Sequence, residues 1–320
     1  MSLFFKKKWD PKGLHCYVTG GSQGLGLETA RILVQKGADV TIVARGVDKL
    51  KEAAAELEKS KQRPEQKIHW LSHSLTSAKE SEQALDEAAA LYGGRCPDAL
   101  FLCAGASAPR FFIDETEETL RQSMDNAYWI QAWSAHAGVK RMVREKVKGK
   151  IVLVSSILGY FGMVGYTSYA PGKHALRGLA EVLRSEFVLY DIAIHIFFPG
   201  TILSPGYERE NITKPAITKK LEETDDGLSP AACAKGLMQG VEAGHFHITC
   251  DLLSNIFRAS TRGNTPQNNF ILDRVYSFFG FVGLPIWRWT VDREVRAHKP
   301  EHMQYVAEHL GDGASSSTSK

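Results

Sequence analysis

The sequence has 320 residues, enough for one large α/β domain or two ordinary ones, and either size buries a substantial core. Its 39 basic and 36 acidic residues leave a net charge of only +3, and no basic run is interleaved with aromatic residues, which argues against a nucleic-acid partner. The five cysteines are odd in number and include no Cys-x-x-Cys pair, so neither a disulfide framework nor a metal site is predicted.

After a basic arm (residues 1–12), the first predicted unit is a strand, a glycine-rich turn and a helix. An apolar run over 14–18 leads directly into Thr-Gly-Gly-Ser-Gln-Gly-Leu-Gly at 19–26, and helical periodicity continues to 36. Glycines permit a tight turn and close approach of the backbone to a pyrophosphate, while the start of the helix offers unpaired amides. This arrangement predicts a dinucleotide site whose candidate contacts are Gly20, Ser22, Gln23, Gly24 and Gly26.

A β-branched run over 38–45 predicts the second parallel strand, and the residues at its end indicate the cofactor. An acidic residue there would accept hydrogen bonds from a ribose 2′-hydroxyl, but this chain has Arg45, with Lys49 four residues later. Two cations suit a 2′-phosphate, so we predict NADPH. The alternative is that Arg45 and Lys49 only begin a solvated helix.

Strands and helices then alternate along the chain. Helices are predicted over 48–61, 77–92, 117–144 and 167–190, and strands over 68–75, 98–104, 150–156 and 192–198. This alternation predicts an α/β fold, a Rossmann-type, doubly wound parallel sheet in a single domain over 13–250. Ligands of such sheets bind at the carboxyl ends of the strands, which is where Gly20, Ala44, Gly105, Ser156 and Pro199 fall.

The predicted chemistry centres on Tyr169 and Lys173, which are four positions apart in the last of these helices. One helical turn separates them on the same face, so we expect the ammonium to favour the ionised phenol and to lower its pKa. A phenol with a pKa of about 10 needs such a neighbour to work as an acid near neutral pH. Ser156 would hydrogen-bond a carbonyl oxygen on which negative charge develops.

The motifs together resemble the short-chain dehydrogenase/reductase family over roughly residues 12–250: Thr19-Gly-x-x-x-Gly-x-Gly26, the Ala104-Gly105 turn, Asn126, Ser156, Tyr169-x-x-x-Lys173 and Pro199-Gly200. The resemblance implies that Tyr169 donates a proton in carbonyl reduction while Ser156 polarises the carbonyl. It implies that Lys173 also holds the nicotinamide ribose and that Asn126 supports a water that relays protons. The other cofactor contacts that it implies are Leu75 near the adenine, Ile202 at the nicotinamide amide, and Gly105, Pro199 and Ser204.

Two departures from the family pattern concern the cofactor end of the site. Ser74 stands where many members have an aspartate, so that adenine contact is expected to be weaker. Leu102 precedes Cys103-Ala-Gly where most members have an asparagine, which removes one side-chain hydrogen bond that supports the turn. Neither departure affects the residues of the predicted chemistry.

Four stretches resemble in particular the members that reduce the 3-keto group of a long-chain sphingoid base with NADPH: the glycine-rich turn, Ala44 to Lys49, the helix over 176–186, and Asn211 to Pro215. Those members work on the cytosolic face of the endoplasmic reticulum membrane. The resemblance therefore implies a long-chain lipid ketone as substrate and that location. We also expect a homodimer or homotetramer.

Three segments bear on the substrate side. Residues 158–166 would supply an apolar wall suited to an alkyl chain, and the mostly charged residues 201–229 predict a mobile lid. The extension over 251–310 contains an apolar run of roughly a dozen residues within 276–289, shorter than the ~18 that span a membrane. This run is either a core helix or dimer contact, or a membrane-interface segment with Trp287 and Trp289 at the headgroup level. Residues 311–320 would form a structureless polar tail.

The sequence leaves three functions open. The first is an NADPH-dependent reductase of a long-chain amphipathic ketone. The second keeps this chemistry but acts on a soluble ketone, such as a steroid, a retinoid or a small carbonyl compound, while the aromatic segment packs in a dimer. The third is a non-catalytic NADPH-binding module at a membrane, which would not need the set Asn126, Ser156, Tyr169 and Lys173.

Overall fold

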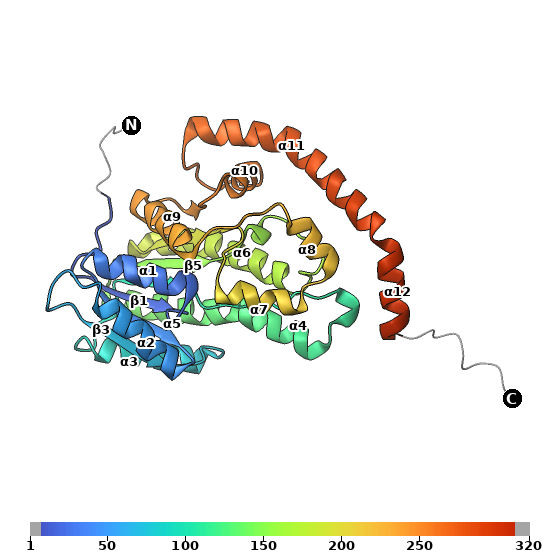
Figure 1. Ribbon diagram of the computed structural model, residues 1–320. Helices are drawn as coiled ribbons and strands as arrows, with labels where there is room; N and C mark the ends of the chain where they lie inside the picture. Colours follow the sequence, from blue (N-terminus) through green and yellow to red (C-terminus); the bar gives the residue numbers. More distant parts are fainter. Residues whose placement is uncertain (1–7, 311–320) are drawn as a thin grey trace.

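The computed structural model describes residues 8–310, so the predictions for 1–7 and 311–320 lie outside it. Seven parallel strands form one sheet in the order β3-β2-β1-β4-β5-β6-β7 (Figure 1). The strands are β1 (His15–Thr19), β2 (Asp39–Ala44), β3 (Ile68–Ser72), β4 (Ala99–Leu102), β5 (Lys150–Val154), β6 (Ala193–Phe197) and β7 (His247–Ile248). The strand order reverses between β1 and β4, which confirms the predicted doubly wound sheet.

Helices cover both faces of the sheet. One face carries α1 (Gly24–Gln35), α2 (Val47–Glu58) and α9 (Pro230–Ala243), and the other carries α3 (Ala78–Ala90), α5 (Ile130–Glu145) and α6 (Tyr169–Phe187). Leu33, Leu50 and Leu237 are fully buried in the first core, and Met142 and Leu176 are fully buried in the second. The central strands are apolar along their length because both of their faces are covered.

The long helix predicted over 117–144 is interrupted. α4 (Glu117–Met124) is followed by a π-helical turn over Asp125–Trp129, and α5 continues from there. A π-helical turn inserts one residue into the helix and is often found at functional sites. Asn126, which sequence reasoning had singled out, lies within this turn.

Two regions differ from the sequence-based prediction. β7 was not predicted, because a strand of two residues carries no periodic signal, but it pairs in parallel with β6. The predicted lid contains two short helices, α7 (Pro205–Thr213) and α8 (Ala216–Glu222). α7 begins where the hydroxyl of Ser204 accepts a hydrogen bond from the amide of Tyr207, so a cap starts a helix whose apolar pattern is weak.

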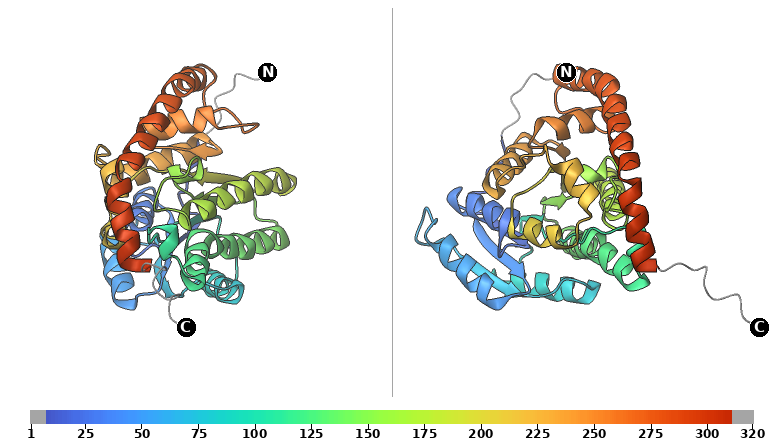
Figure 2. Two further views of the ribbon diagram at one scale, coloured as in Figure 1. Left: turned by 90° about the vertical axis from the view of Figure 1, so that its right-hand side faces the viewer. Right: turned by 45° about the vertical axis from the view of Figure 1, so that its right-hand side comes forward.

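The C-terminal extension forms three helices: α10 (Leu252–Ser260), α11 (Phe270–Ala297) and α12 (Lys299–Leu310). α11 and α12 run along the outside of the domain, from α10 towards the end at which α4 lies (Figures 1 and 2). The apolar run expected to be about a dozen residues long is part of the 28-residue helix α11. Within residues 8–310, α11 is the one helix long and apolar enough to cross a membrane by length and composition.

One face of α11 is fixed to α10. Arg258 of α10 and Asp273 of α11 form a buried ion pair, with Nη2 and Oδ1 2.6 Å apart. Further along, α10 and α11 approach so closely that a Cβ atom on Gly280 would overlap the hydroxyl of Ser260. At the far end, the hydroxyl of Tyr305 donates a hydrogen bond to Asp114 at 2.7 Å. The first half of α11 is therefore fixed to α10, and α12 is fixed to the domain at Asp114.

Candidate active site

A single cleft of about 1060 Å³ lies at the carboxyl ends of the strands. Every residue that the sequence singled out for catalysis or cofactor binding lines it: Gly20, Ser22, Gln23, Gly24, Gly26, Arg45, Lys49, Leu75, Gly105, Asn126, Ser156, Tyr169, Lys173, Pro199, Ile202 and Ser204. The fold thus brings together positions that are as much as 184 residues apart in the chain, from 20 to 204.

The turn between β1 and α1 is shaped to admit a phosphate group. Gly20 has a φ of +66°, and a Cβ atom there would lie 2.9 Å from the amide nitrogen of Ala104. The amides at the start of α1 donate no hydrogen bond to the side chain of Gln23, the capping residue. These donors are therefore available to an anion, at the end of the helix where the dipole is positive.

Two cations lie at the end of β2. Arg45 and Lys49 are both exposed, and within residues 8–310 neither has a carboxylate at ion-pair distance. The ammonium of Lys49 lies 3.5 Å from the side-chain oxygen of Gln23, next to the phosphate-binding turn. An anion bound at this edge would gain two charge partners without displacing an existing one.

The two departures from the family pattern have local explanations. The hydroxyl of Ser74 donates to Glu80 at 2.5 Å, so this side chain is held by the following helix, α3. Leu102 stands where most members have an asparagine that supports this turn. Here the hydroxyl of Thr19 supports it instead, by accepting a hydrogen bond from the amide of Ala104 at 3.1 Å. The turn that ends β4 therefore keeps a side-chain support from a neighbouring strand.

The predicted reacting groups meet at the ends of β5 and α6. The ammonium of Lys173 lies 5.3 Å from the centre of the Tyr169 ring and donates to the carbonyl of Val154 at 3.0 Å. Ser156 lies within hydrogen-bonding reach of the Tyr169 phenol, and its hydroxyl accepts from the amide of Leu158 at 3.2 Å. A carbonyl group placed between Ser156 and Tyr169 would meet two hydroxyl donors.

The electrostatics of this pair differ from the expectation. Burial raises the pKa of Tyr169, the charge of Glu210 raises it further, and the hydrogen bond with Ser156 opposes the rise. Burial also lowers the pKa of Lys173 to about 7, so near neutral pH the lysine carries only part of a charge. The prediction that Lys173 lowers the pKa of Tyr169 is therefore wrong for the protein alone. Tyr169 is held protonated, as a proton donor must be before it reacts.

Asn126 and a residue that sequence reasoning missed complete this corner. A Cβ atom on Gly105 would lie 3.1 Å from the carbonyl oxygen of Asn126 and 3.8 Å from the ammonium of Lys173. Gln131, fully buried on α5, donates to the carbonyl of Val154 and accepts from the amide of the same residue. The feature of the sequence that could have identified Gln131 is that it is a glutamine on the inner face of an apolar helix. Gln131 fixes the end of β5, from which Ser156 follows.

Aromatic and apolar side chains form the other end of the cleft. Phe161 and Met163 come from the segment predicted as an apolar wall, and Leu253 comes from α10. α11 contributes Trp287 and Val291, with the indole of Trp287 5.1 Å from the ring of Phe161. Of the two alternatives left open for Trp287, the structure supports the packed one, because its ring is part of the cleft wall.

The chain matches the model of the short chain dehydrogenase family over residues 15–214. It belongs to that family. Among its relatives, a 3-ketodihydrosphingosine reductase of Cryptococcus neoformans is 43% identical over 92% of this chain and 88% of its own length. A 3-ketodihydrosphingosine reductase of Dictyostelium discoideum is 31% identical over 89% of this chain and 87% of its own. Among solved structures, LigD of Sphingobium, at 21% identity, covers 81% of this chain with all of its own and shares the fold with a TM-score of 0.65.

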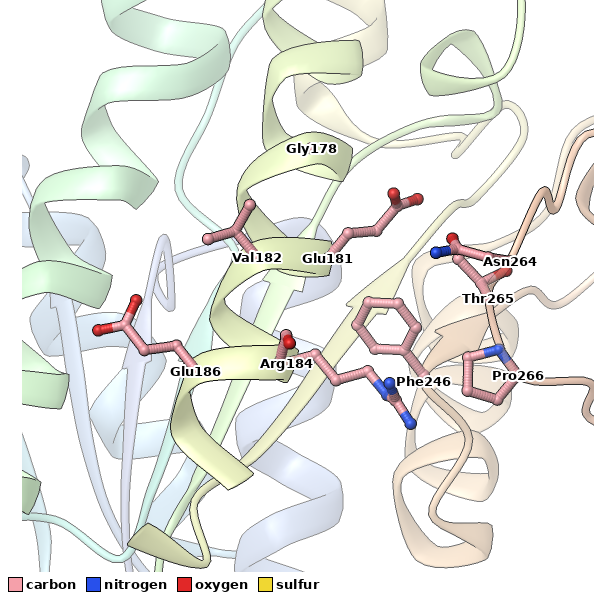
Figure 3. Close-up of a pocket in the computed structure, with 10 residues that line it drawn as sticks. Gly178, Glu181, Val182, Arg184, Glu186, Phe246, Asn264, Thr265 and Pro266 are labelled. Carbon is pink, nitrogen blue, oxygen red and sulfur yellow. The ribbon is translucent and has the colours of Figure 1, made fainter. Parts of the chain in front are cut away.

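Family membership makes the chain an oxidoreductase that acts on a carbonyl or hydroxyl group with a nicotinamide cofactor. The cleft fits such a cofactor, since the close approach at Gly20 and the free amides of α1 admit a pyrophosphate. A second cavity, of about 660 Å³, lies elsewhere, beside the C-terminal half of α6 (Figure 3). It is lined by side chains such as Arg184, Phe246 and Pro266 and contains none of the predicted site residues. The strand-end cleft is therefore the candidate dehydrogenase site.

Proposed function

We propose that this dehydrogenase reduces the 3-keto group of 3-ketodihydrosphingosine to dihydrosphingosine, using NADPH. One observation carries the proposal: the hydroxyls of Ser156 and Tyr169 open into a cleft whose far wall is apolar and aromatic. A ketone with a long alkyl chain matches both ends of this cleft at once, with its polar group at the hydroxyls and its chain along Phe161 and Trp287. The names of relatives that cover most of the chain agree with this substrate.

In this function, Tyr169 donates its phenolic proton to the carbonyl oxygen as negative charge develops there. Ser156 holds the same oxygen through a second hydrogen bond. The cofactor, when bound, supplies the hydride. The carbonyl of Val154 orients the ammonium of Lys173 beneath the Tyr169 ring, where a protonated lysine favours loss of the phenolic proton.

The remaining predicted residues have positioning roles in this proposal. Asn126, in the π-helical turn, supports the water that returns a proton to this corner. The turn after β1 holds the pyrophosphate, and Arg45 with Lys49 holds the 2′-phosphate that distinguishes NADPH from NADH. The other proposed cofactor contacts are Leu75, Gly105, Pro199, Ile202 and Ser204.

The outer face of α11 supports a place at a membrane surface, which we propose to be the cytosolic face of the endoplasmic reticulum. Large apolar side chains recur on this face every three or four residues and are all exposed: Ile271, Val275, Phe278, Val282, Ile286 and Trp289. A bilayer interface would cover such a row. A homodimer or homotetramer remains our expectation.

The test is NADPH oxidation with 3-ketodihydrosphingosine in detergent, compared with a soluble ketone such as a steroid. We expect turnover of the lipid ketone and little or none of the soluble one. Tyr169→Phe should lose turnover by about 10²- to 10⁴-fold while its NADPH affinity stays nearly unchanged. Retained turnover in this variant, or a preference for the soluble ketone, would refute the assignment.

A further inference from the structure

A compact group of charged residues joins the two lid helices to the wall of the cleft. The hydroxyl of Tyr166 lies 2.6 Å from Oε1 of Glu210, on α7, and 2.8 Å from Oε1 of Glu222, on α8. The ammonium of Lys214 lies 2.9 Å from Oε1 of Glu210 and 2.6 Å from Oε2 of Glu222. Tyr166 and both glutamates line the same cleft as the reacting groups.

The charges in this group do not cancel. Two carboxylates face one ammonium, and all three side chains are largely buried, with exposed fractions of 18%, 14% and 0% for Glu210, Glu222 and Lys214. Within residues 8–310, every contact of the Glu210 carboxylate uses Oε1, and Oε2 has no hydrogen-bond partner. The cleft thus contains an excess negative charge with an acceptor oxygen to spare, which favours a cation.

The group adjoins the reaction centre. The rings of Tyr166 and Tyr169 are 6.0 Å apart, so Glu210 is one side chain away from the proposed proton donor. Its charge opposes ionisation of Tyr169, which raises the pKa of that phenol. A carboxylate in this position therefore works against the chemistry of the tyrosine, and its presence calls for a different role.

A second cation in this region, Arg209 of α7, forms no ion pair with either carboxylate among residues 8–310. The guanidinium of Arg209 would lie 4.0 Å from a Cβ atom on Gly206, at the start of the helix. That end of α7 faces the cofactor side, since Ser204 approaches Gly24 of the phosphate-binding turn. Arg209 thus belongs to the cofactor end of the cleft, and the negative charge at the substrate end stands without it.

We propose that Glu210, supported by Glu222, binds the protonated amino group of the substrate and makes the cleft selective for α-amino ketones. This inference rests on the proposed function. In 3-ketodihydrosphingosine the amino group is on the carbon next to the carbonyl. A carbonyl held by Ser156 and Tyr169 therefore places the ammonium within the neighbourhood of Tyr166 and Glu210. The same negative charge repels ketones that carry an anionic group on the carbon next to the carbonyl, so the cleft disfavours their binding.

The experiment compares two long-chain ketones that differ in one group: 3-ketodihydrosphingosine and 1-hydroxyoctadecan-3-one, which lacks the amino group. For the wild-type protein we expect kcat/KM to be about 10- to 100-fold higher for the amino ketone. Glu210→Gln should remove most of this preference, mainly through KM of the amino ketone, and leave the deaminated ketone nearly unaffected. Glu222→Gln should show a smaller loss of the same kind.

Glu208→Gln is the matched control, because Glu208 lies on α7 as well but is exposed and outside the cleft. It should retain the full preference, and all variants should keep the wild-type NADPH affinity. An equal loss on both ketones in Glu210→Gln, or no loss on either, would overturn the role in amine binding. If the wild type reduces both ketones equally well, this inference fails while the proposed function stands. If it reduces neither, the proposed function fails as well.

Discussion

The buried ion pair between Arg258 and Asp273 holds α11 against α10, and removing one partner should be costly. Both side chains are almost inaccessible, with exposed fractions of 3% and 1%, and two hydrogen bonds of 2.9 and 2.6 Å join them. Asp273→Leu leaves the guanidinium charge buried without its partner. We expect this to lower the free energy of unfolding by about 3–5 kcal/mol, with the loss of turnover that follows when Trp287 and Val291 no longer close the cleft.

Urea unfolding at neutral pH measures this loss, and the double variant Arg258→Met/Asp273→Leu shows its origin. Because an apolar pair of similar volume often replaces a buried ion pair at little cost, the double variant should recover most of the lost stability. Glu294→Gln breaks the exposed bridge between α11 and Lys220 and should leave stability unchanged within error. A cost below 1 kcal/mol for Asp273→Leu, or an equal cost in the double variant, would refute the reasoning.

The pH dependence provides an independent check on the same pair. Burial tends to raise the pKa of Asp273, but the hydrogen bonds and charge of Arg258 outweigh it, so the pKa lies below its usual value. A carboxylate whose pKa is lowered by folding stabilises the protein above its unfolded pKa of about 4. The difference between wild type and Asp273→Leu should therefore shrink as the pH falls through the folded pKa.

Three further predictions concern the cofactor, the membrane and Lys173. Arg45→Ala should lower the preference for NADPH over NADH by about tenfold or more in binding titrations, because a charge-assisted hydrogen bond to the 2′-phosphate is lost; an unchanged preference would contradict the assignment. Ile286→Glu, at a position 61% exposed on α11, should reduce co-sedimentation with phosphatidylcholine vesicles by about tenfold without lowering the melting temperature. The pKa of Lys173 falls to about 7 on folding, so the unfolded chain binds the extra proton between about pH 7 and 10. The stability of the wild type relative to Lys173→Met should therefore rise with pH across this range, and a fall in urea titrations would show that burial does not govern this lysine.

The nucleotide half of the site could be predicted because local patterns determine it. Gly20 is required by a positive φ and by a close approach to Ala104, and both demands follow from a turn between a buried strand and a helix. Alternating strands and helices then determine the sheet, whose strand ends collect residues such as Ser156 and Lys49 from distant parts of the chain. Each of these predictions depends only on residues that lie within about thirty positions of one another in the sequence.

The substrate half could not be predicted in the same way, because tertiary contacts determine it. Gln131 carries no motif, and its role becomes visible only when α5 lies against the end of β5. Burial likewise outweighs the expected effect of Lys173 on the pKa of Tyr169, since spacing along a helix gives proximity but not the cost of removing a charge from water. Lys214, between the lid helices α7 and α8, pairs with Glu210 four residues before it on α7 and with Glu222 eight residues after it on α8, so their order depends on how the two helices pack.

Composition alone left the role of α11 open, because both of its faces are apolar although only one of them is covered by the rest of the protein within residues 8–310. Trp287 lines the cleft, whereas Trp289, two positions later, is 63% exposed on the opposite side. The inner face packs against α10 and the cleft, whereas the side chains of the outer row are exposed. If the outer row lies in a bilayer interface, as we propose, the apolar end of the cleft opens beside the membrane. A long-chain ketone could then pass from lipid to Tyr169 along a single helix without exposing its alkyl chain to water, which would otherwise cost about 0.8 kcal/mol per methylene group.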